Sequence, residues 1–323
     1  MDSSTELLPV LAPAPGDLTL TAQAEHYFRA SQAFNTRRAY GADWRHFLQW
    51  CQAAGRGSLP ASPETLVLYL SALAQTAKTS TLARRASAIS QAHQAAGFDS
   101  PTHHLAVRKV MAGIRREKGT AQTGKRPVVT EDLRAMVGPL KKNRALDVRD
   151  RALLLVGFAG AFRRSELVGL NVDDLEFNRE GLVANIRRSK TDPEGQGRRL
   201  GIPYGSTPAT CPVRALEAWL EILGADDGPV FRRINRHGHI GGKRLTAQSV
   251  ALVVKRAAAA VGLDPDPLAG HSLRAGLATA AAAAGVSERA IMAQTGHRSV
   301  TMLRKYIREG SLFLENAAAK VGL

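Results

Sequence analysis

The sequence changes character at residues 118–129, and this break most constrains how the chain can fold. Before it, apolar residues recur at helical spacing, and inside it glycine, proline and basic residues interrupt that spacing. The interrupting residues are Lys118, Gly119, Gly124, Lys125, Arg126 and Pro127. A chain of 323 residues is long enough for two ordinary domains. We therefore expect 118–129 to be a basic linker between two domains.

Residues 17–117 predict an all-helical domain. We expect one helix to be capped by Asn35 and a second to begin at Ser62, because Pro63 suits the first turn of a helix. A third would open at residues 78–81 and a fourth would run from about 101 to 117. Residues 1–16 contain three prolines and little periodicity, which predicts a disordered tail.

The second half mixes helices with short strands. Thr130 begins one expected helix, and residues 147–160 form a buried one. The apolar period then changes, and three strands are expected at 172–177, 182–186 and 198–203. Further helices are expected at 211–224 and 246–262, and the basic, glycine-rich stretch 231–244 is expected to be a loop, either touching DNA or mobile at the surface. The expected fold class is therefore mainly α, with a helical N-terminal domain and an α+β C-terminal domain containing a small antiparallel three-stranded sheet.

The charge of the chain points to a polyanionic partner. The formal net charge is +16 and the sequence pI is about 10.5, so nucleic acid is the first candidate and a membrane surface the rival. No run of 18 or more apolar residues predicts a transmembrane helix, and the N-terminus lacks the basic region of a secretory signal. Aromatic residues make up 5%, which argues against a base-stacking single-strand binder. Cys51 and Cys211 are expected to be reduced, as in a cytoplasmic protein, with one distant disulfide as the alternative.

Basic residues outside the apolar stripes are the candidate DNA contacts. Any one of them could be a solvated surface side chain, but together with the net charge they favour contact with phosphates. The candidates are Arg37, Arg38, Arg84, Arg85, Arg115, Arg116, Lys125, Arg126, Lys255 and Arg256. Arg84, Arg85 and the helix around Lys255 and Arg256 are the expected groove contacts.

One constellation carries chemistry. Its members are Arg163, Lys190, His271, Arg274, His297 and Tyr306. Each alone has a structural interpretation, such as a surface ion pair of Arg163 with Glu166 or a core tyrosine at position 306. Together they suit phosphodiester cleavage without a metal. Arginine forks face the charge that develops on the phosphate, histidines handle protons, a lysine protonates the leaving oxygen and Tyr306 is the nucleophile.

The order and spacing of these residues resemble the tyrosine recombinase, or phage integrase, family. The shared motifs are R-x-S-E-L at Arg163 to Leu167, H-x-L-R at His271 to Arg274, G-H at Gly296-His297, and a tyrosine nine residues later. Among family members, the Cre-like recombinases are the most similar. Arg164 departs from the pattern, because the family usually has an apolar residue there. So does Ala275, where many members carry histidine although Cre-like members lack it.

The resemblance implies a site-specific DNA recombinase that works through a covalent 3′-phosphotyrosyl intermediate. Residues 17–117 would be a SAM-like core-binding domain, 130–310 the catalytic domain and 311–323 a helix for protomer contact. Glu166 would support the active-site arginine, and no cofactor or metal is expected. The expected partner is double-stranded DNA with inverted-repeat sites, bound by a homotetramer on two duplexes in the bacterial nucleoid or on plasmid or phage DNA, with no membrane. The alternatives are a type IB topoisomerase-like enzyme and a non-catalytic DNA-binding protein of the same fold.

Overall fold

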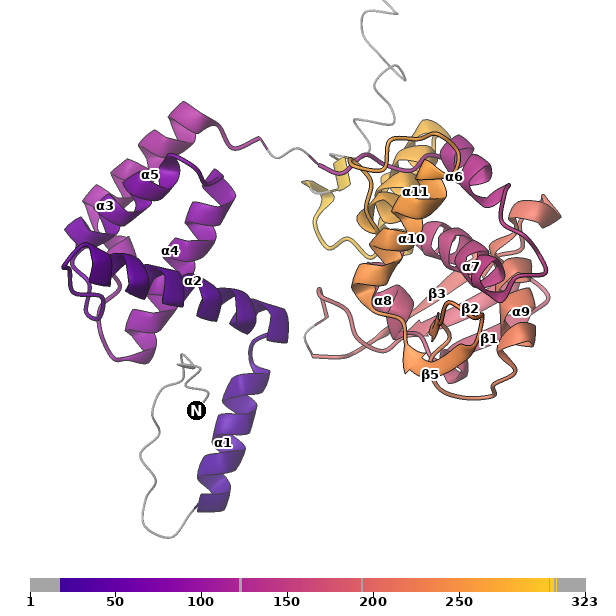
Figure 1. Cartoon of the computed structure of the whole chain (residues 1–323), viewed down its shortest axis with the longest axis horizontal. Helices are drawn as coiled ribbons and strands as arrows, with labels where there is room; N and C mark the ends of the chain where they lie inside the picture. Colours follow the sequence, from indigo (N-terminus) through magenta and orange to yellow (C-terminus); the bar gives the residue numbers. More distant parts are fainter. Residues whose placement is uncertain (1–17, 122–123, 193, 302, 305, 307–323) are drawn as a thin grey trace, which may run out of the picture. The chain divides into compact units, whose positions relative to one another are not determined.

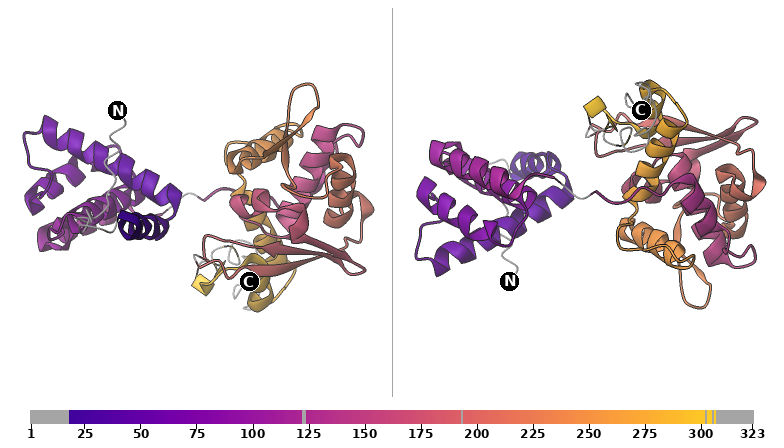
Figure 2. Two further views of the ribbon diagram at one scale, coloured as in Figure 1. Left: turned by 90° about the horizontal axis from the view of Figure 1, so that it is seen from below. Right: turned by 90° about the horizontal axis from the view of Figure 1, so that it is seen from above.

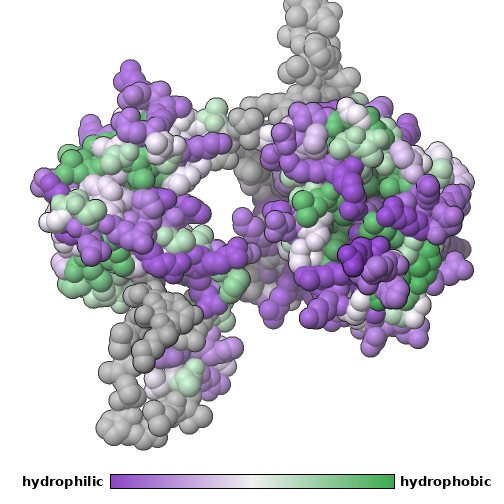
Figure 3. All heavy atoms as spheres, viewed as in Figure 1, coloured by the Kyte–Doolittle hydropathy of each residue, from purple (hydrophilic) through white to green (hydrophobic). Residues whose placement is uncertain are grey.

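Two compact units make up the chain, Met1–Thr123 and Gly124–Leu323 (Figure 1). The computed structural model describes residues 18–121, 124–192, 194–301, 303–304 and 306. The tail expected at 1–16 and the C-terminal helix expected at 311–323 lie outside these residues. Much of the surface visible in Figure 3 is hydrophilic on both units.

The first unit is all-helical. Its helices are α1 (Leu18–Ala30), α2 (Phe34–Ala53), α3 (Pro63–Ala74), α4 (Thr79–Ala95) and α5 (Leu105–Lys118), with a 3-10 turn at Pro101–His103. The predicted start of α3 is confirmed, since Ser62 Oγ accepts from Thr65 N at 3.1 Å and Pro63 occupies the first turn. The cap predicted at Asn35 is wrong. Helix α2 already begins at Phe34, and Ala33 at its N-cap makes no side-chain cap.

The core of the first unit forms where α2 packs against α4 and α3 against α5. It buries large side chains such as Trp44, Phe47 and Tyr69. This apolar burial is the dominant stabilising contribution for a unit of this size. Helix α1 differs, because Leu20 and Tyr27 on it are 61% and 64% exposed.

The second unit is α+β. Its helices are α6 (Thr130–Val137), α7 (Ala145–Ala159), α8 (Arg164–Gly169), α9 (Pro212–Leu223), α10 (Ala247–Ala259), α11 (His271–Ala283) and α12 (Glu288–Thr295). Its strands are β1 (Leu175–Asn178), β2 (Gly181–Ile186), β3 (Arg198–Pro203), β4 (Arg232–Ile234) and β5 (Ile240–Arg244). Strands β1, β2 and β3 form one antiparallel sheet in that order, visible in Figure 2. The expected fold class is therefore confirmed.

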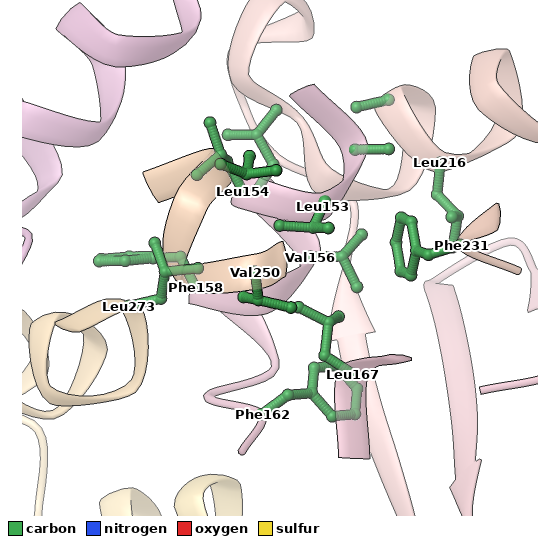
Figure 4. Close-up of a cluster of buried hydrophobic side chains, with 14 of the residues drawn as sticks. Leu153, Leu154, Val156, Phe158, Phe162, Leu167, Leu216, Phe231, Val250 and Leu273 are labelled. Atoms are coloured by element: carbon green, nitrogen blue, oxygen red, sulfur yellow. The ribbon is translucent and has the colours of Figure 1, made fainter. Parts of the chain in front are cut away.

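Helix α7 is the centre of this unit. It is buried nearly all round and packs against α9, α10 and α11, which explains its almost continuous apolar sequence. Figure 4 shows its side chains Leu153, Val156 and Phe158 among residues of the neighbouring elements. Leu167 of α8 and Leu273 of α11 lie in the same cluster, so the core fixes both helices that carry candidate site residues.

Two predicted elements differ from the structure. The strand expected from residue 172 begins at Leu175, because 172–174 is a 3-10 turn in which Asp174 accepts from Asn171 N at 2.9 Å. The stretch expected as a loop at 231–244 is instead the β4–β5 hairpin. Strands are recognised in a sequence by apolar residues at every second position. These two strands are short, rich in glycine and basic residues, and paired with an irregular register, so they lack that pattern.

The end of the expected basic linker packs against the second unit. Arg126 N donates to Pro267 O at 2.9 Å, and Val128 N donates to Ser272 O at 3.0 Å. The fit is tight, since a Cβ placed on Gly276 of α11 would lie 1.8 Å from Val128 O. Residues 126–128 therefore form part of the unit that contains α11.

Candidate active site

The turn between α7 and α8 presents Arg163. Ala161 there has φ of 46°, a left-handed conformation that non-glycine residues seldom adopt. The Glu166 side chain reaches back from α8 to accept from Arg163 N at 3.0 Å and from Arg163 Nη1 at 2.6 Å. Its carboxylate is fully buried, with 0% side-chain exposure. The alternative interpretation as a surface ion pair therefore does not describe this contact.

Ser189 ties the β2–β3 loop to this pair. Its Oγ donates to Glu166 Oε1 at 2.8 Å and accepts from Arg163 Nη1 at 2.7 Å. Burial alone would raise the pKa of Glu166, but the hydrogen bonds from Arg163 and Ser189 and the charge of Arg163 lower it below the usual value. Glu166 is therefore ionised, and it orients the Arg163 guanidinium from behind.

Lys190 follows Ser189 directly and is exposed. The loop that carries it is closed by Asp192, which accepts from Gln196 N at 3.0 Å and from Gly197 N at 2.8 Å. Among the described side chains, no hydrogen bond links Lys190 to the Arg163–Glu166 pair. The anchored Ser189 nevertheless fixes where the loop leaves the cluster.

Arg274 is the second arginine and is only 2% exposed. Its Nη1 donates to Ala161 O at 2.8 Å, which joins α11 to the turn that presents Arg163. Burial, with the charges of Arg163 and Arg198, lowers the pKa of Arg274 to about 10, so it stays protonated at neutral pH. Its buried Nη2 has no hydrogen-bond partner among the described residues, and a buried donor of this kind favours an anionic ligand.

Tyr306 and His271 meet at the edge of this cluster. The Tyr306 hydroxyl lies 2.6 Å from His271 Nε2. Loss of hydration around the ring, followed by the charges of Arg274, Arg164 and Arg163, lowers the pKa of His271. A neutral histidine at this distance can accept the phenol hydrogen. Arg164, which departs from the family pattern, is exposed, and the aliphatic part of its side chain packs over Gly270.

His297 faces Tyr306 from the other side, with ring centroids 5.9 Å apart. Its Nδ1 lies 2.7 Å from Thr295 Oγ1, and that hydroxyl donates its one hydrogen to Ile291 O at 2.7 Å. The network therefore assigns a hydrogen to Nδ1 and leaves Nε2 as an acceptor in the neutral ring. Burial, followed by the charges of Arg274, Arg163, His271 and Arg198, lowers the pKa of His297 to about 4.

Within the second unit, the structure brings together five of the six predicted residues and leaves Lys190 on the adjoining loop. It also adds Ser189, Arg198 and Thr295, which the sequence reasoning missed. Ser189 could have been suspected from its place beside Lys190, whereas the other two follow no motif. Among the described residues, no group of three or more His, Cys, Asp or Glu could hold a metal ion. No described helix is long and apolar enough to span a membrane.

The candidate DNA contacts fall into two groups. Arg38, Arg115 and Arg116 are exposed, and Arg37 is half-buried. The others contact protein groups: Arg84 pairs with Asp43, Arg126 with Asp132, Lys255 with Asp266 and Arg256 with Asp150, and Lys125 donates to Asp266 O. Arg85 is 17% exposed and donates to Tyr69 Oη, with its Nη1 also 2.8 Å from His46 Nδ1. Its position inside this network gives it a structural role in the first unit, and its contact with DNA stays a prediction.

Comparisons with known proteins agree across both units. A model described as the phage integrase family matches residues 128–311, and one described as the phage integrase N-terminal SAM-like domain matches residues 24–97. An integrase/recombinase XerD homolog from Selenomonas ruminantium is 44% identical over 301 residues, covering 92% of this chain and 88% of that protein. Recombinase Cre of Escherichia phage P1 is 27% identical over 307 residues, covering 87% and 86%. The chain is thus more similar to the Selenomonas protein than to Cre, whose likeness had stood out in the motifs.

Solved structures share the fold. The XerH site-specific recombinase bound to palindromic difH substrate matches with a TM-score of 0.61 and 18% identity, over 80% of this chain and 72% of that one. A lambda integrase dimer bound to a COC′ core site matches with a TM-score of 0.59 and 17% identity, over 89% and 76%. At these identities the likeness concerns the path of the backbone.

Proposed function

The chain belongs to the phage integrase family of tyrosine recombinases, and from that premise we propose that it is a site-specific DNA recombinase with Tyr306 as nucleophile. One observation carries the assignment of the nucleophile. The Tyr306 hydroxyl lies 2.6 Å from His271 Nε2, beside the arginines that suit a phosphate. A phenol has a pKa of about 10, so it needs an acceptor at this distance to attack at neutral pH.

In the first step the Tyr306 oxygen attacks the scissile phosphorus while its proton passes to His271. The bond between phosphorus and the 5′-oxygen breaks, and Lys190 protonates the leaving oxygen. The result is a 3′-phosphotyrosyl link and a free 5′-hydroxyl. Rejoining reverses these transfers with a 5′-hydroxyl from another strand. The bond energy stays in the link, so the exchange needs no separate energy source.

Arg163 and Arg274 would hold the non-bridging oxygens. Their forks are charged throughout the working pH range and can each bind two oxygens. Because both are held by buried partners, Glu166 for Arg163 and Ala161 O for Arg274, they are oriented before the DNA arrives. Such preorganised donors cost little reorganisation when charge develops in the transition state. His297 would donate to a phosphate oxygen once it is protonated.

The DNA partner would be a duplex carrying inverted repeats, contacted by the helical domain (17–117) and by the catalytic domain (130–310). Exposed cations support this, with Arg38, Arg115 and Arg116 on the first unit and the β4–β5 hairpin on the second. Arg233 and Lys243 on this hairpin are exposed. The protein would act where bacterial DNA lies, in the cytoplasmic nucleoid or on plasmid or phage DNA.

A covalent-capture experiment tests the assignment. Duplexes selected from random DNA by the full-length protein are incubated with it and analysed in SDS. We expect the wild type to form a DNA adduct and Tyr306→Phe to form none, while Tyr204→Phe, whose hydroxyl donates to Glu217 at 2.8 Å, keeps it. Absence of a wild-type adduct would contradict the enzyme assignment. Strand exchange between two sites, rather than relaxation of supercoils alone, separates a recombinase from a topoisomerase.

Assembly is the remaining part of the proposal. Residues 311–323 contain Leu312, Phe313 and Leu314 close together, and such an apolar terminal segment needs a pocket, which we place on a neighbouring copy in a homotetramer on two duplexes. Deleting 311–323 should leave binding to a single half-site intact and abolish cooperative assembly on a full site. Gel-shift titration measures both, and unchanged cooperativity in the truncated protein would rule out this role.

A further inference from the structure

Arg198 places a third guanidinium in the candidate active site, although no motif marks it. It is the first residue of β3, and its side chain is 23% exposed. Its Nη2 lies 3.8 Å from Glu166 Oε2, and its Nη1 donates to Ala293 O at 3.3 Å and Gln294 O at 3.2 Å. One arginine thus joins the carboxylate that holds Arg163 to the end of α12.

The same guanidinium lies against the turn that leads into His297. Gly296 there has φ of 65°, and a Cβ built on it would lie 3.0 Å from Arg198 Cζ. A side chain at 296 would therefore meet both backbone strain and the guanidinium. Arg198 and His297 also line one cavity of about 200 Å³, together with Ser189 and Arg298. The arginine therefore touches the backbone that positions His297.

The charge of Arg198 has a consequence for catalysis. Glu166 is ionised and orients Arg163, but its negative charge also cancels the charge of that arginine. A phosphodiester gains a second negative charge as it becomes pentacoordinate, and fixed cations must face that charge. Arg163, Arg274 and Glu166 alone would supply one unbalanced positive charge. With Arg198 the cluster supplies two, which matches the doubly charged transition state.

The hydrogen-bonding state of Arg198 agrees with this role. Its Nε and Nη2 are buried and make no hydrogen bond among the described residues. The Glu166 oxygen at 3.8 Å is too far for a hydrogen bond, although it is close enough for charge attraction. A purely structural arginine would be expected to use these donors, because unpaired buried donors are destabilising.

We propose that Arg198 is a positioning residue of this active site, which offsets the charge of Glu166 and holds the turn that presents His297. This inference rests on the proposed function for its catalytic consequence. The groups that face His297 are Arg274, Arg163, His271, Tyr306 and Arg198 itself, with Thr295 on its Nδ1.

The test compares Arg198→Gln with a matched neighbour, Arg199→Gln. Arg199 points to the other face of the same strand, is 66% exposed and pairs with Glu176. The first measurement is the rate of SDS-stable adduct formation on the selected duplex. We expect R198Q to lose on the order of 10²-fold, the lower range for one fixed donor, while R199Q stays at the wild-type rate.

A second measurement needs no cleavage. Histidine NMR titration of the DNA-free full-length chain follows His297, whose pKa of about 4 should rise in R198Q, because one of the positive charges that lower it has been removed while its burial and the other charges remain. R199Q should leave it in place. A His297 midpoint and an adduct rate in R198Q that both equal those of R199Q would overturn the inference.

A double variant separates charge from scaffolding. Glu166→Gln removes the negative charge that Arg198 offsets, but it also weakens the contact that orients Arg163. The charge-offset role therefore predicts that Arg198→Gln slows adduct formation less in the Glu166→Gln background than in the wild type. An equal fold-loss in the two backgrounds would overturn the charge-offset role. Should R198Q fail to fold by circular dichroism, R198K keeps the charge without the fork. If R198K keeps most of the wild-type rate of adduct formation and a His297 midpoint close to that of the wild type, the inference is supported. If R198K is as inactive as Y306F, the inference is overturned. If the wild type forms no adduct, the proposed function fails, while the titration still tests Arg198.

Discussion

At the scale of single residues, proton positions decide which steps the site can perform. His271 has a lowered pKa and lies 2.6 Å from the Tyr306 hydroxyl, so it remains a proton acceptor below the usual histidine value of 6.5. Part of that shift comes from Arg164, the residue that departs from the family pattern. The apolar residue that the family usually carries at 164 would leave His271 easier to protonate.

We therefore expect Arg164→Leu to shift the pH dependence of cleavage. Removing the positive charge raises the pKa of His271, so the acid loss of activity should begin at a higher pH than in the wild type. Initial rates of adduct formation between pH 4.5 and 8 measure this shift. Arg179→Leu, at the exposed β1–β2 turn, serves as control and should keep the wild-type profile. Superimposable profiles for all three proteins would refute the role assigned to Arg164.

His297 gives a second prediction at this scale. In the DNA-free protein its Nε2 is an acceptor and its pKa is about 4, so it cannot donate to a phosphate at neutral pH. A bound phosphate is an anion and favours the protonated ring. Histidine NMR on the non-cleaving Tyr306→Phe variant should therefore show the His297 midpoint rising when the selected duplex is added. A midpoint that stays near 4 would mean that His297 only accepts or packs.

Site residues that carry no motif and reach the site only through the fold could not be predicted from the sequence. Arg163, Arg274 and Tyr306 could be predicted because their residue types and order suit one reaction. Thr295 and Arg198 could not, because a serine, threonine or arginine in a polar stretch is ordinarily solvated. Only the fold brings Arg198 both to 3.8 Å from Glu166 of α8 and into contact with Gln294 O of α12.

At the scale of elements, α11 carries the site and depends on one glycine. His271 and Arg274 occupy its first turn, and Gly276 lies where Val128 O approaches. We expect Gly276→Ala to lower the free energy of unfolding of the second unit by about 1–3 kcal/mol, as overpacking typically does. The backbone, rather than a flexible side chain, would have to move.

Urea denaturation with a probe in each unit measures this effect. Gly113→Ala is the matched control, since it lies within helix α5 and its added methyl group meets nothing within 4 Å. It should stabilise the first unit by about 0.5–1 kcal/mol, because alanine loses less backbone entropy in a helix. Equal free energies of unfolding for Gly276→Ala and the wild type would contradict the prediction and show that the backbone at 126–128 can move away at little cost.

Element prediction succeeded where local chemistry fixes a boundary. Ser62, followed by Pro63, caps α3 through its own hydroxyl, so the sequence signal and its physical cause lie in the same residues. The β4–β5 hairpin was missed because its strands are held from outside. Arg244 donates to Val168 O and Leu170 O, which are more than seventy residues away.

At the scale of the whole molecule, each unit has its own core and its own exposed cations. The net charge of +16 alone does not tell which cations meet DNA. Many are already paired with carboxylates, such as Arg144 with Asp147 at 3.7 Å, and such pairs neutralise charge that would otherwise attract phosphate. The cations that displace counterions should instead be exposed residues such as Arg38 on the first unit and Lys243 on the second.

The salt dependence of DNA affinity gives the number of phosphates that these cations contact, and variants show whether both units contribute. Each phosphate neutralised contributes about −0.9 to the slope of log K against log salt on duplex DNA. Arg38→Gln and Lys243→Gln should each make the slope about 0.9 less steep, and the double variant about 1.8, because distant contacts add. Arg144→Gln should leave the slope unchanged. Fluorescence anisotropy across a salt series measures all four, and a slope altered by only one of the two substitutions would mean that a single unit holds the duplex.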